Sequence, residues 1–125
     1  MRDVDTVRPD DYAGSALAVR ALIERGHRRI AYANFLHGRV TVEDEHYSVA
    51  HRHDGAVEAM RQAGLEPLTW VPPKQNVGRN VEEYALKMLS TVNRPTAVLS
   101  HSQIEAQCLL LAAGRAGLSV PGDLS

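Results

Sequence analysis

Four stretches with helical spacing alternate with three short apolar runs along the chain, and glycine or proline separates them. The clearest boundary is Gly-His-Arg-Arg at residues 26–29. Gly26 enters the left-handed region without steric cost and so ends a helix, and the two arginines lie near the negative end of the helix dipole. The apolar run at residues 30–33 is too short for a helix and is typical of a strand buried on both faces. The repeated pattern predicts an α/β fold.

The first predicted helix follows the capping residues Asp10 and Asp11, and it runs to about Arg25. The second ends at Gly64, and the third runs from Asn76 to Val92. The fourth opens with Ser102-Gln103-Ile104-Glu105, a capping box, and closes at Gly117. The spacing assigns apolar faces to the helices: Gly14, Leu17, Ala18, Ala21 and Leu22 on the first; Val49, His53, Ala56, Val57 and Met60 on the second; Val77, Val81, Tyr84, Ala85, Met88, Leu89 and Val92 on the third; and Ile104, Cys108, Leu111 and Ala112 on the fourth.

The predicted strands are residues 30–33, 65–71 and 96–100, and residues 4–7 form a further short extended segment. Helices between buried strands imply right-handed crossovers, hence a parallel sheet with helices on both faces. We expect a three-layer αβα sandwich with strand order 2-1-3. Its outer edge then leaves the backbone groups of Thr96, Val98 and Ser100 unpaired, unless residues 4–7 or a second copy covers them.

Ligands of such sheets bind beyond the carboxyl ends of the strands. Here those ends are residues 34–37, 71–74 and 100–103. Trp70 lies near one of them and is either a packing residue or a ring on which a sugar can stack. A functional site is therefore expected at this edge of the sheet.

The composition favours a single globular unit. The 125 residues carry 14 basic and 15 acidic side chains, a balance that argues against nucleic-acid binding by this piece alone. Cys108 is the only cysteine, so no internal disulfide forms. No apolar segment has the length of a membrane span, and the first residues do not form a signal peptide. The chain stops at Ser125 where a further strand is expected, which indicates a fragment.

Some side chains are of types that bind metals or take part in catalysis, so both kinds of site need to be considered. The candidate metal ligands are histidines and an acidic run: His37, Glu43, Asp44, Glu45, His46, His51 and His53. Their spacing matches no metal motif, so we expect neither metal nor cofactor. His101 and Ser102 lie at a strand end, but adjacent residues that leave a strand rarely point the same way. No glycine-rich phosphate loop follows any strand. We expect no enzyme.

Five short motifs, in this order and spacing, resemble the lactose/galactose-repressor (LacI/GalR) family of transcription regulators. They are Asp-Asp-Tyr-Ala-Gly at 10–14, Gly-His-Arg-Arg-Ile-Ala at 26–31, Ser-Val-Ala-His-Arg-His-Asp-Gly at 48–55, Pro-Thr-Ala-Val at 95–98, and Gly-Leu-Ser-Val-Pro-Gly-Asp-Leu-Ser at 117–125. The family joins a helix-turn-helix to a two-lobed, periplasmic-binding-protein-like effector module. The resemblance implies that residues 1–125 are one α/β lobe of that module, without the DNA-binding domain and the first lobe.

The resemblance also implies a ligand site. Arg52 matches the arginine that contacts the effector in the family, although a surface arginine is an equally open interpretation. Ser48 matches the serine that opens the same helix and can be a simple N-cap. After the third strand the family places Asn-Asp, where this chain has Ser102-Gln103, a change that removes a strong acceptor for sugar hydroxyls. Ser102 is also interpretable as a helix cap alone. The implied ligand-binding residues are Arg52, Ser102, Gln103, Ser48 and His101.

The implied function is effector sensing in a cytoplasmic LacI-type regulator, with a sugar or related small molecule as effector. The implied partners are that effector, operator DNA through a domain absent from this chain, and a second copy in a homodimer, with no membrane. The alternative is a solute-binding protein of a sugar transport system with the same fold. A helix-turn-helix or a signal peptide upstream would decide between the two.

Overall fold

The computed structural model describes residues 5–35, 47–72 and 80–125. These residues form helices and strands in strict alternation after the first helix. In chain order they are α1 (Asp11–Glu24), β1 (Ile30–Ala33), α2 (Tyr47–Gln62), β2 (Leu68–Trp70), α3 (Val81–Leu89), β3 (Ala97–Ser100) and α4 (Gln103–Arg115). The strands form a parallel sheet in the order β2-β1-β3. The predicted α/β class and strand order are confirmed.

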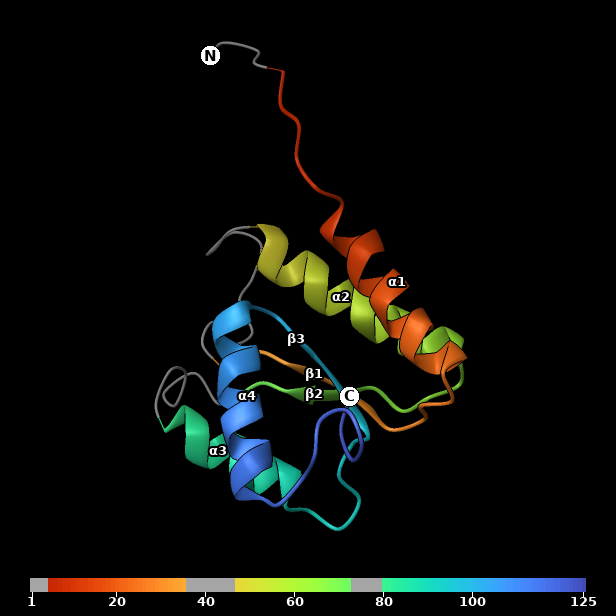
Figure 1. The fold of residues 1–125 in the computed structure, drawn as a ribbon. Coiled ribbons are helices and arrows are strands. Elements are labelled where there is room, and N and C mark those ends of the chain that lie inside the picture. Colours follow the sequence, from red (N-terminus) through yellow and green to blue (C-terminus); the bar gives the residue numbers. More distant parts are fainter. Residues whose placement is uncertain (1–4, 36–46, 73–79) are drawn as a thin grey trace.

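Helices cover both faces of the sheet, as Figure 1 shows. The side chains of β1 alternate between two hydrophobic clusters, as those of a strand between two helical layers must. One cluster joins the sheet to α1 and α2: Ala16, Val19, Ile30, Tyr32, Ala56, Ala59, Met60 and Ala97. The other joins it to α3 and α4: Ala31, Ala33, Phe35, Trp70, Ala85, Leu89, Leu109, Ala112, Ala113 and Leu124. The predicted three-layer αβα sandwich is therefore present.

The predicted glycine stops are confirmed. Gly26, Gly64 and Gly117 have φ angles of 95°, 72° and 73°, which lie in the left-handed region. The capping of α2 also explains why β2 is shorter than predicted. The amide of Leu65 donates to the carbonyl oxygen of Met60 at 2.9 Å, so Leu65 belongs to the end of the helix rather than to the strand.

The third helix is shorter than predicted at its carboxyl end. It ends at Leu89 rather than Val92, and Val92 is 99% exposed. The hydroxyls of Ser90 and Thr91 donate to the carbonyl oxygens of Leu86 and Met88, at 2.7 and 3.0 Å. These side chains take up carbonyls that a further helical turn would use. Its predicted cap, Asn76, lies outside the described residues, and Asn80 holds the N-cap position.

Two predicted helix faces are wrong in part, although Ala112 of α4 is buried as predicted and Leu22 of α1 packs against the core. In α1 the buried residues are Asp11, Ser15, Ala16 and Val19, whereas Leu17 is 66% exposed. In α4 they are Glu105, Leu109, Ala112 and Ala113, whereas Ile104 and Leu111 are 61% and 64% exposed. Both helices carry apolar side chains on more than one side. In each of these two helices, the side that carries small residues packs against the neighbouring elements, because small side chains let the helix approach them more closely.

The predictions for the outer edge of β3 also need correction. The amide of Val98 donates to the carbonyl oxygen of Ser125, and the amide of Ser125 donates to that of Thr96, both at 2.9 Å. This is the bonding pattern of a parallel ladder, so Ser125 pairs the carbonyl of Thr96 and the amide of Val98, which belong to two of the three residues expected to be open. Residues 5–10 form no strand and project away from the helices (Figure 1), and Val7 is fully exposed. They do not cover the edge.

Candidate functional site

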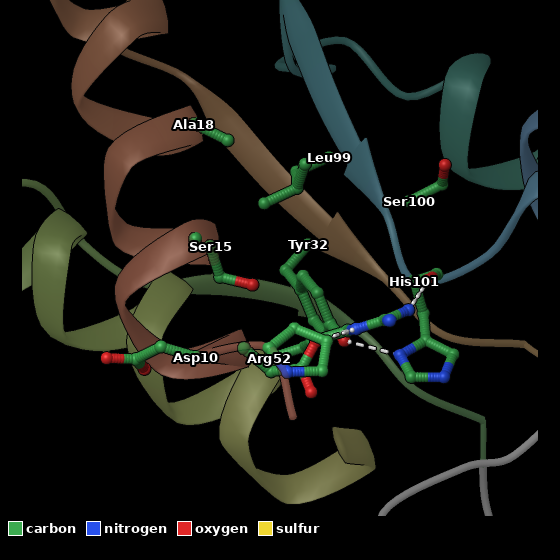
Figure 2. Close-up of a pocket in the computed structure, with 11 residues that line it drawn as sticks. Asp10, Ser15, Ala18, Tyr32, Arg52, Leu99, Ser100 and His101 are labelled. Atoms are coloured by element: carbon green, nitrogen blue, oxygen red, sulfur yellow. Dashed lines mark hydrogen bonds and ion pairs between the residues drawn. The ribbon is translucent and has the colours of Figure 1, made fainter. Parts of the chain in front are cut away.

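A hollow of about 300 Å³ lies where β3 ends, beside the first half of α1 and the second turn of α2. Figure 2 shows side chains from these elements around it. Leu99 and Ala18 contribute apolar surface. The polar lining comes from Asp10, Asp11, Ser15, Tyr32, Arg52, Ser100 and His101. The hollow is thus at the carboxyl end of a parallel strand, where the fold class places ligands.

Arg52 is held at this hollow by two acceptors from different elements. Its Nε–H donates to Oδ1 of Asp11 at 2.9 Å, and its NH1 group donates to the carbonyl oxygen of His101 at 2.9 Å. The Asp11 side chain is only 8% exposed, and that of Arg52 is 39% exposed. The guanidinium therefore joins α1, α2 and the turn after β3, and it still reaches solvent.

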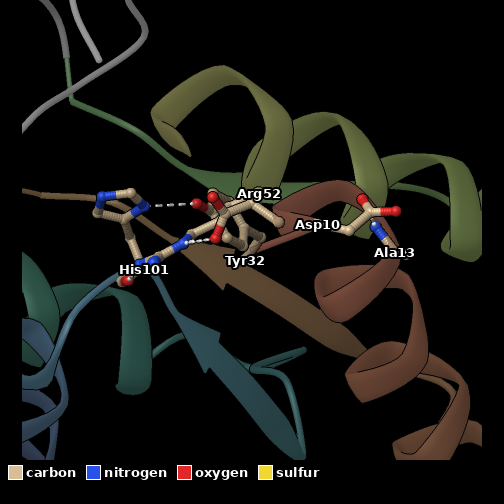
Figure 3. A network of polar contacts seen from close by, with 6 residues as sticks. Asp10, Ala13, Tyr32, Arg52 and His101 are labelled. Atoms are coloured by element: carbon tan, nitrogen blue, oxygen red, sulfur yellow. Dashed lines mark hydrogen bonds and ion pairs between the residues drawn. The ribbon is translucent and has the colours of Figure 1, made fainter. Parts of the chain in front are cut away.

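A second contact fixes the ring of His101. The hydroxyl oxygen of Tyr32 lies 3.0 Å from Nδ1 of His101, and both residues are buried. Burial and, after it, the negative charge of Glu105 raise the pKa of Tyr32 well above its ordinary value, and the positive charge of Arg52 opposes this only in part. Tyr32 consequently keeps its proton. Figure 3 shows how Tyr32, Arg52 and His101 meet at one point of the molecule.

The structure brings together two of the five ligand residues that the sequence implied. Arg52 and His101 both line the hollow. Ser102 is the N-cap of α4, and its Oγ accepts from the amide of Glu105 at 3.5 Å, which confirms the serine half of the capping box. Gln103 is exposed on the first turn of α4, and Ser48 is half-buried at the start of α2. These last three residues are not part of the lining that the described residues form.

Asp11 and Tyr32 are site residues that the sequence reasoning missed. Asp11 was assigned to helix capping, but the cap is Asp10, whose Oδ1 accepts from the amide of Ala13 at 3.0 Å. Tyr32 lies in the apolar run at residues 30–33, for which the sequence predicts only a strand buried on both faces. The one available signal was its polar tip near the end of a buried strand, because a buried tyrosine hydroxyl needs a partner.

The sequence left two roles open for Trp70, packing in the core or stacking on a sugar, and the structure gives it the packing role. It is 1% exposed, and its ring stacks with that of Phe35 at a centroid distance of 6.3 Å and an interplanar angle of 19°. A ring this deeply buried in the core offers no face to a ligand. Trp70 therefore belongs to the hydrophobic cluster beneath α3 and α4.

The described parts of the chain contain no group of three His, Cys, Asp or Glu side chains that could hold a metal ion. Most of the candidate metal ligands from the sequence, at residues 37–46, lie outside these parts. Nor is any described helix long and apolar enough to cross a membrane.

The family model for periplasmic binding protein-like domains matches residues 19–125. Among curated proteins, the transcriptional repressor PurR of Serratia proteamaculans is 33% identical over 122 residues, which are 97% of this chain and 34% of the repressor. The chain thus spans about a third of the length of the curated relatives it matches.

The solved structures that this chain resembles are also transcriptional regulators. A LacI-family transcriptional regulatory protein from Corynebacterium glutamicum superposes with a TM-score of 0.76 at 32% identity, over 97% of this chain and 46% of that protein. A LacI transcriptional regulator from a Rhodococcus species superposes with a TM-score of 0.73 at 31% identity, over 98% of this chain and 42% of that one. The resemblance drawn from the five motifs is confirmed. These relatives are regulators rather than enzymes, and they do not favour the transport-protein alternative.

Proposed function

Because the chain belongs to the periplasmic binding protein-like domain family, we propose that it is the effector-binding lobe of a LacI-type transcriptional regulator. Residues 1–125 then form one lobe of a two-lobed module. The DNA-binding domain and the other lobe belong to the rest of the regulator, and the protein works in the cytoplasm, where its operator is. The lobe acts by binding a small molecule and not by catalysis.

The observation that carries this proposal is the placement of Arg52. Its guanidinium stands at the carboxyl end of β3, fixed by Asp11 and the His101 carbonyl, and is 39% exposed at the hollow. Two of its five N–H groups are used in these contacts, so among the described residues three remain as donors to a ligand. His101 adds a ring at the same place. Ser48, Ser102 and Gln103 stay candidate contacts from the starts of α2 and α4.

The effector we expect is a sugar or a related small molecule rich in acceptors. Arginine N–H groups bind hydroxyl, carbonyl and carboxylate oxygens in a fixed geometry. The Asp11 carboxylate already balances the charge of Arg52, which favours neutral acceptors over a second anion. Because the effector lies between two lobes, one lobe supplies part of its contacts and little burial. We therefore expect this chain to bind the effector weakly on its own.

We also propose that the regulator is a homodimer that uses the outer surface of α4. Ile104, Leu110 and Leu111 are 61%, 55% and 64% exposed there. Beside them is an apolar hollow of about 180 Å³ lined by Val98, Leu109, Leu110, Val120 and Leu124 among others. Large exposed apolar patches of this kind mark interaction sites. Operator DNA is contacted only through the domain outside this chain.

A thermal-shift experiment on the intact regulator tests the proposed function. The panel contains D-ribose, D-galactose, adenosine and inorganic phosphate. A ligand that binds only the folded state raises the unfolding temperature as its concentration exceeds its Kd. We expect a neutral compound to stabilise the wild-type regulator and an Arg52→Ala variant to lose this stabilisation. An identical response of the two proteins would contradict the assignment of Arg52.

A further inference from the structure

Helices α1 and α2 approach each other closely at Gly55. A Cβ atom at Gly55 would overlap the backbone carbonyl of Tyr12, so only glycine permits this crossing. Arg52 lies on α2 nearly one turn before Gly55, and Asp11 directly precedes Tyr12 on α1. The crossing therefore places the side chains of Arg52 and Asp11 side by side.

The contacts that result fix the whole plane of the guanidinium. Asp11 Oδ1 accepts from Nε–H at 2.9 Å, and the carbonyl oxygen of His101 accepts from NH1 at 2.9 Å. The guanidinium is planar, so two bonded N–H groups define the directions of the other three. The His101 backbone is in turn close to fixed, because its amide donates to the carbonyl oxygen of Ala33 at 2.9 Å and its ring meets Tyr32.

We propose that Asp11 is a positioning residue, which holds Arg52 in its ligand-binding orientation before the ligand arrives. This inference rests on the proposed function, since it takes Arg52 as an effector contact. A free arginine side chain loses rotamer freedom when it binds, and that loss lowers affinity. Asp11 removes the loss in advance. Its carboxylate is suited to this role because it is 8% exposed, so water screens the ion pair less than at the surface.

Asp10 provides a matched control for Asp11. It is adjacent in sequence and lines the same hollow, but its carboxylate caps α1 by accepting from the amide of Ala13. The exposed ion pair between Arg115 and Glu82, at 2.9 Å with side chains 56% and 47% exposed, is a control for removal of an acidic partner elsewhere.

The first arm of the test measures exchange of the Arg52 Nε proton by ¹⁵N NMR on this chain. We expect slow exchange in the wild type, faster exchange in Asp11→Asn, and exchange faster by about tenfold or more in Asp11→Ala, the factor of a lost charge-assisted hydrogen bond. Asp10→Ala and Glu82→Gln should leave it unchanged. Asn keeps the size of Asp and an acceptor oxygen, so it remains informative if the alanine variant does not fold. Equal exchange in wild type and both Asp11 variants would overturn the proposal.

The second arm uses the intact regulator and the same four panel compounds. Asp11→Asn should weaken binding of the stabilising compound about tenfold in the wild-type background. In the Arg52→Ala background, Asp11→Asn should change binding less than twofold, because the guanidinium that Asp11 positions is absent. Additive effects would overturn the positioning role while leaving the proposed function intact. If Arg52→Ala binds every compound as the wild type does, the ligand role of both residues fails.

Discussion

The hydroxyl oxygen of Tyr32 lies 3.0 Å from Nδ1 of His101, 69 positions later in the chain. Tyr32 belongs to the central strand, and His101 follows the neighbouring strand, so this bond ties the carboxyl ends of β1 and β3 together beneath the candidate site. Both side chains are buried, at 1% and 7% exposure. Neither polar group has free access to bulk water, so the bond has consequences for stability.

Replacing Tyr32 with Phe should destabilise the chain by about 1–3 kcal/mol, because it leaves a buried ring nitrogen without its hydroxyl partner. Urea unfolding of the 125-residue chain measures this. Tyr12→Phe is the control: Tyr12 is 41% exposed, and we expect a change below about 0.5 kcal/mol. Equal midpoints for the wild type and Tyr32→Phe would show that the bond contributes nothing.

Gly55→Ala should be one of the most damaging small substitutions in the chain. The new methyl group would overlap the Tyr12 carbonyl, so α1 and α2 must separate. We expect a loss of about 1–3 kcal/mol, the range for overpacked cores. Gly114→Ala is the matched control, since a Cβ there meets nothing within 4 Å and alanine favours a helix by about 1 kcal/mol over glycine. In thermal unfolding, Gly55→Ala should have a lower transition temperature than the wild type, and Gly114→Ala should not. The same loss for both would exclude the helix crossing as the cause.

The turn at the carboxyl end should loosen in acid. Oδ2 of Asp123 accepts from the amide of Ser119 at 2.8 Å and from its hydroxyl at 2.9 Å. These bonds, chiefly the one from the backbone amide, lower the pKa of Asp123 from its ordinary value of 3.8. A carboxyl whose pKa is lower in the folded state stabilises that state above pH 3.8, and it loses this effect as the pH falls through its folded value.

NMR titration of the Asp123 side-chain carbon measures that pKa directly. Ser119→Ala removes the hydroxyl and keeps the amide, so the lowering should shrink without vanishing. A midpoint for the wild-type carboxyl at or above 3.8 would contradict the contact.

Leu111→Glu should convert the expected dimer into a monomer, because it places a charge on the apolar surface of α4. Leu17→Glu is the control on α1, where a leucine is 66% exposed, close to the 64% of Leu111. Light scattering should give a dimer mass for the wild type and Leu17→Glu, and a monomer mass for Leu111→Glu. A monomeric wild-type chain at high concentration would remove the α4 surface as an interface of this lobe.

Much of the fold could be predicted from the sequence because it depends on local signals. Gly26, Gly64 and Gly117 mark helix ends by their own conformational freedom, and the apolar run at β1 marks a strand buried on both faces. The orientation of α1 and α4 could not be predicted in this way. Both helices have apolar side chains on two sides, and only the shape of the neighbouring layer selects the buried one.

Two residues of the candidate site could be predicted from the sequence, but the residues that hold them in place could not. Arg52 stood out within its motif, and His101 stood out by its position at a strand end. Their partners were not visible, because Asp11 is 41 positions from Arg52 and Tyr32 is 69 from His101. The first pair depends on how closely two helices cross, and the second on which strands are neighbours. Neither is encoded near the residues themselves.

The most direct test of the central claim is operator binding by the intact regulator with and without effector, measured by fluorescence anisotropy. The effector is the panel compound that stabilises the wild type, and the operator is selected from random DNA. We predict that effector changes the operator affinity of the wild type and of the control Arg115→Ala. We also predict that Arg52→Ala binds operator as tightly as the wild type but does not respond to effector. A full effector response from Arg52→Ala at the same effector concentration would contradict the account.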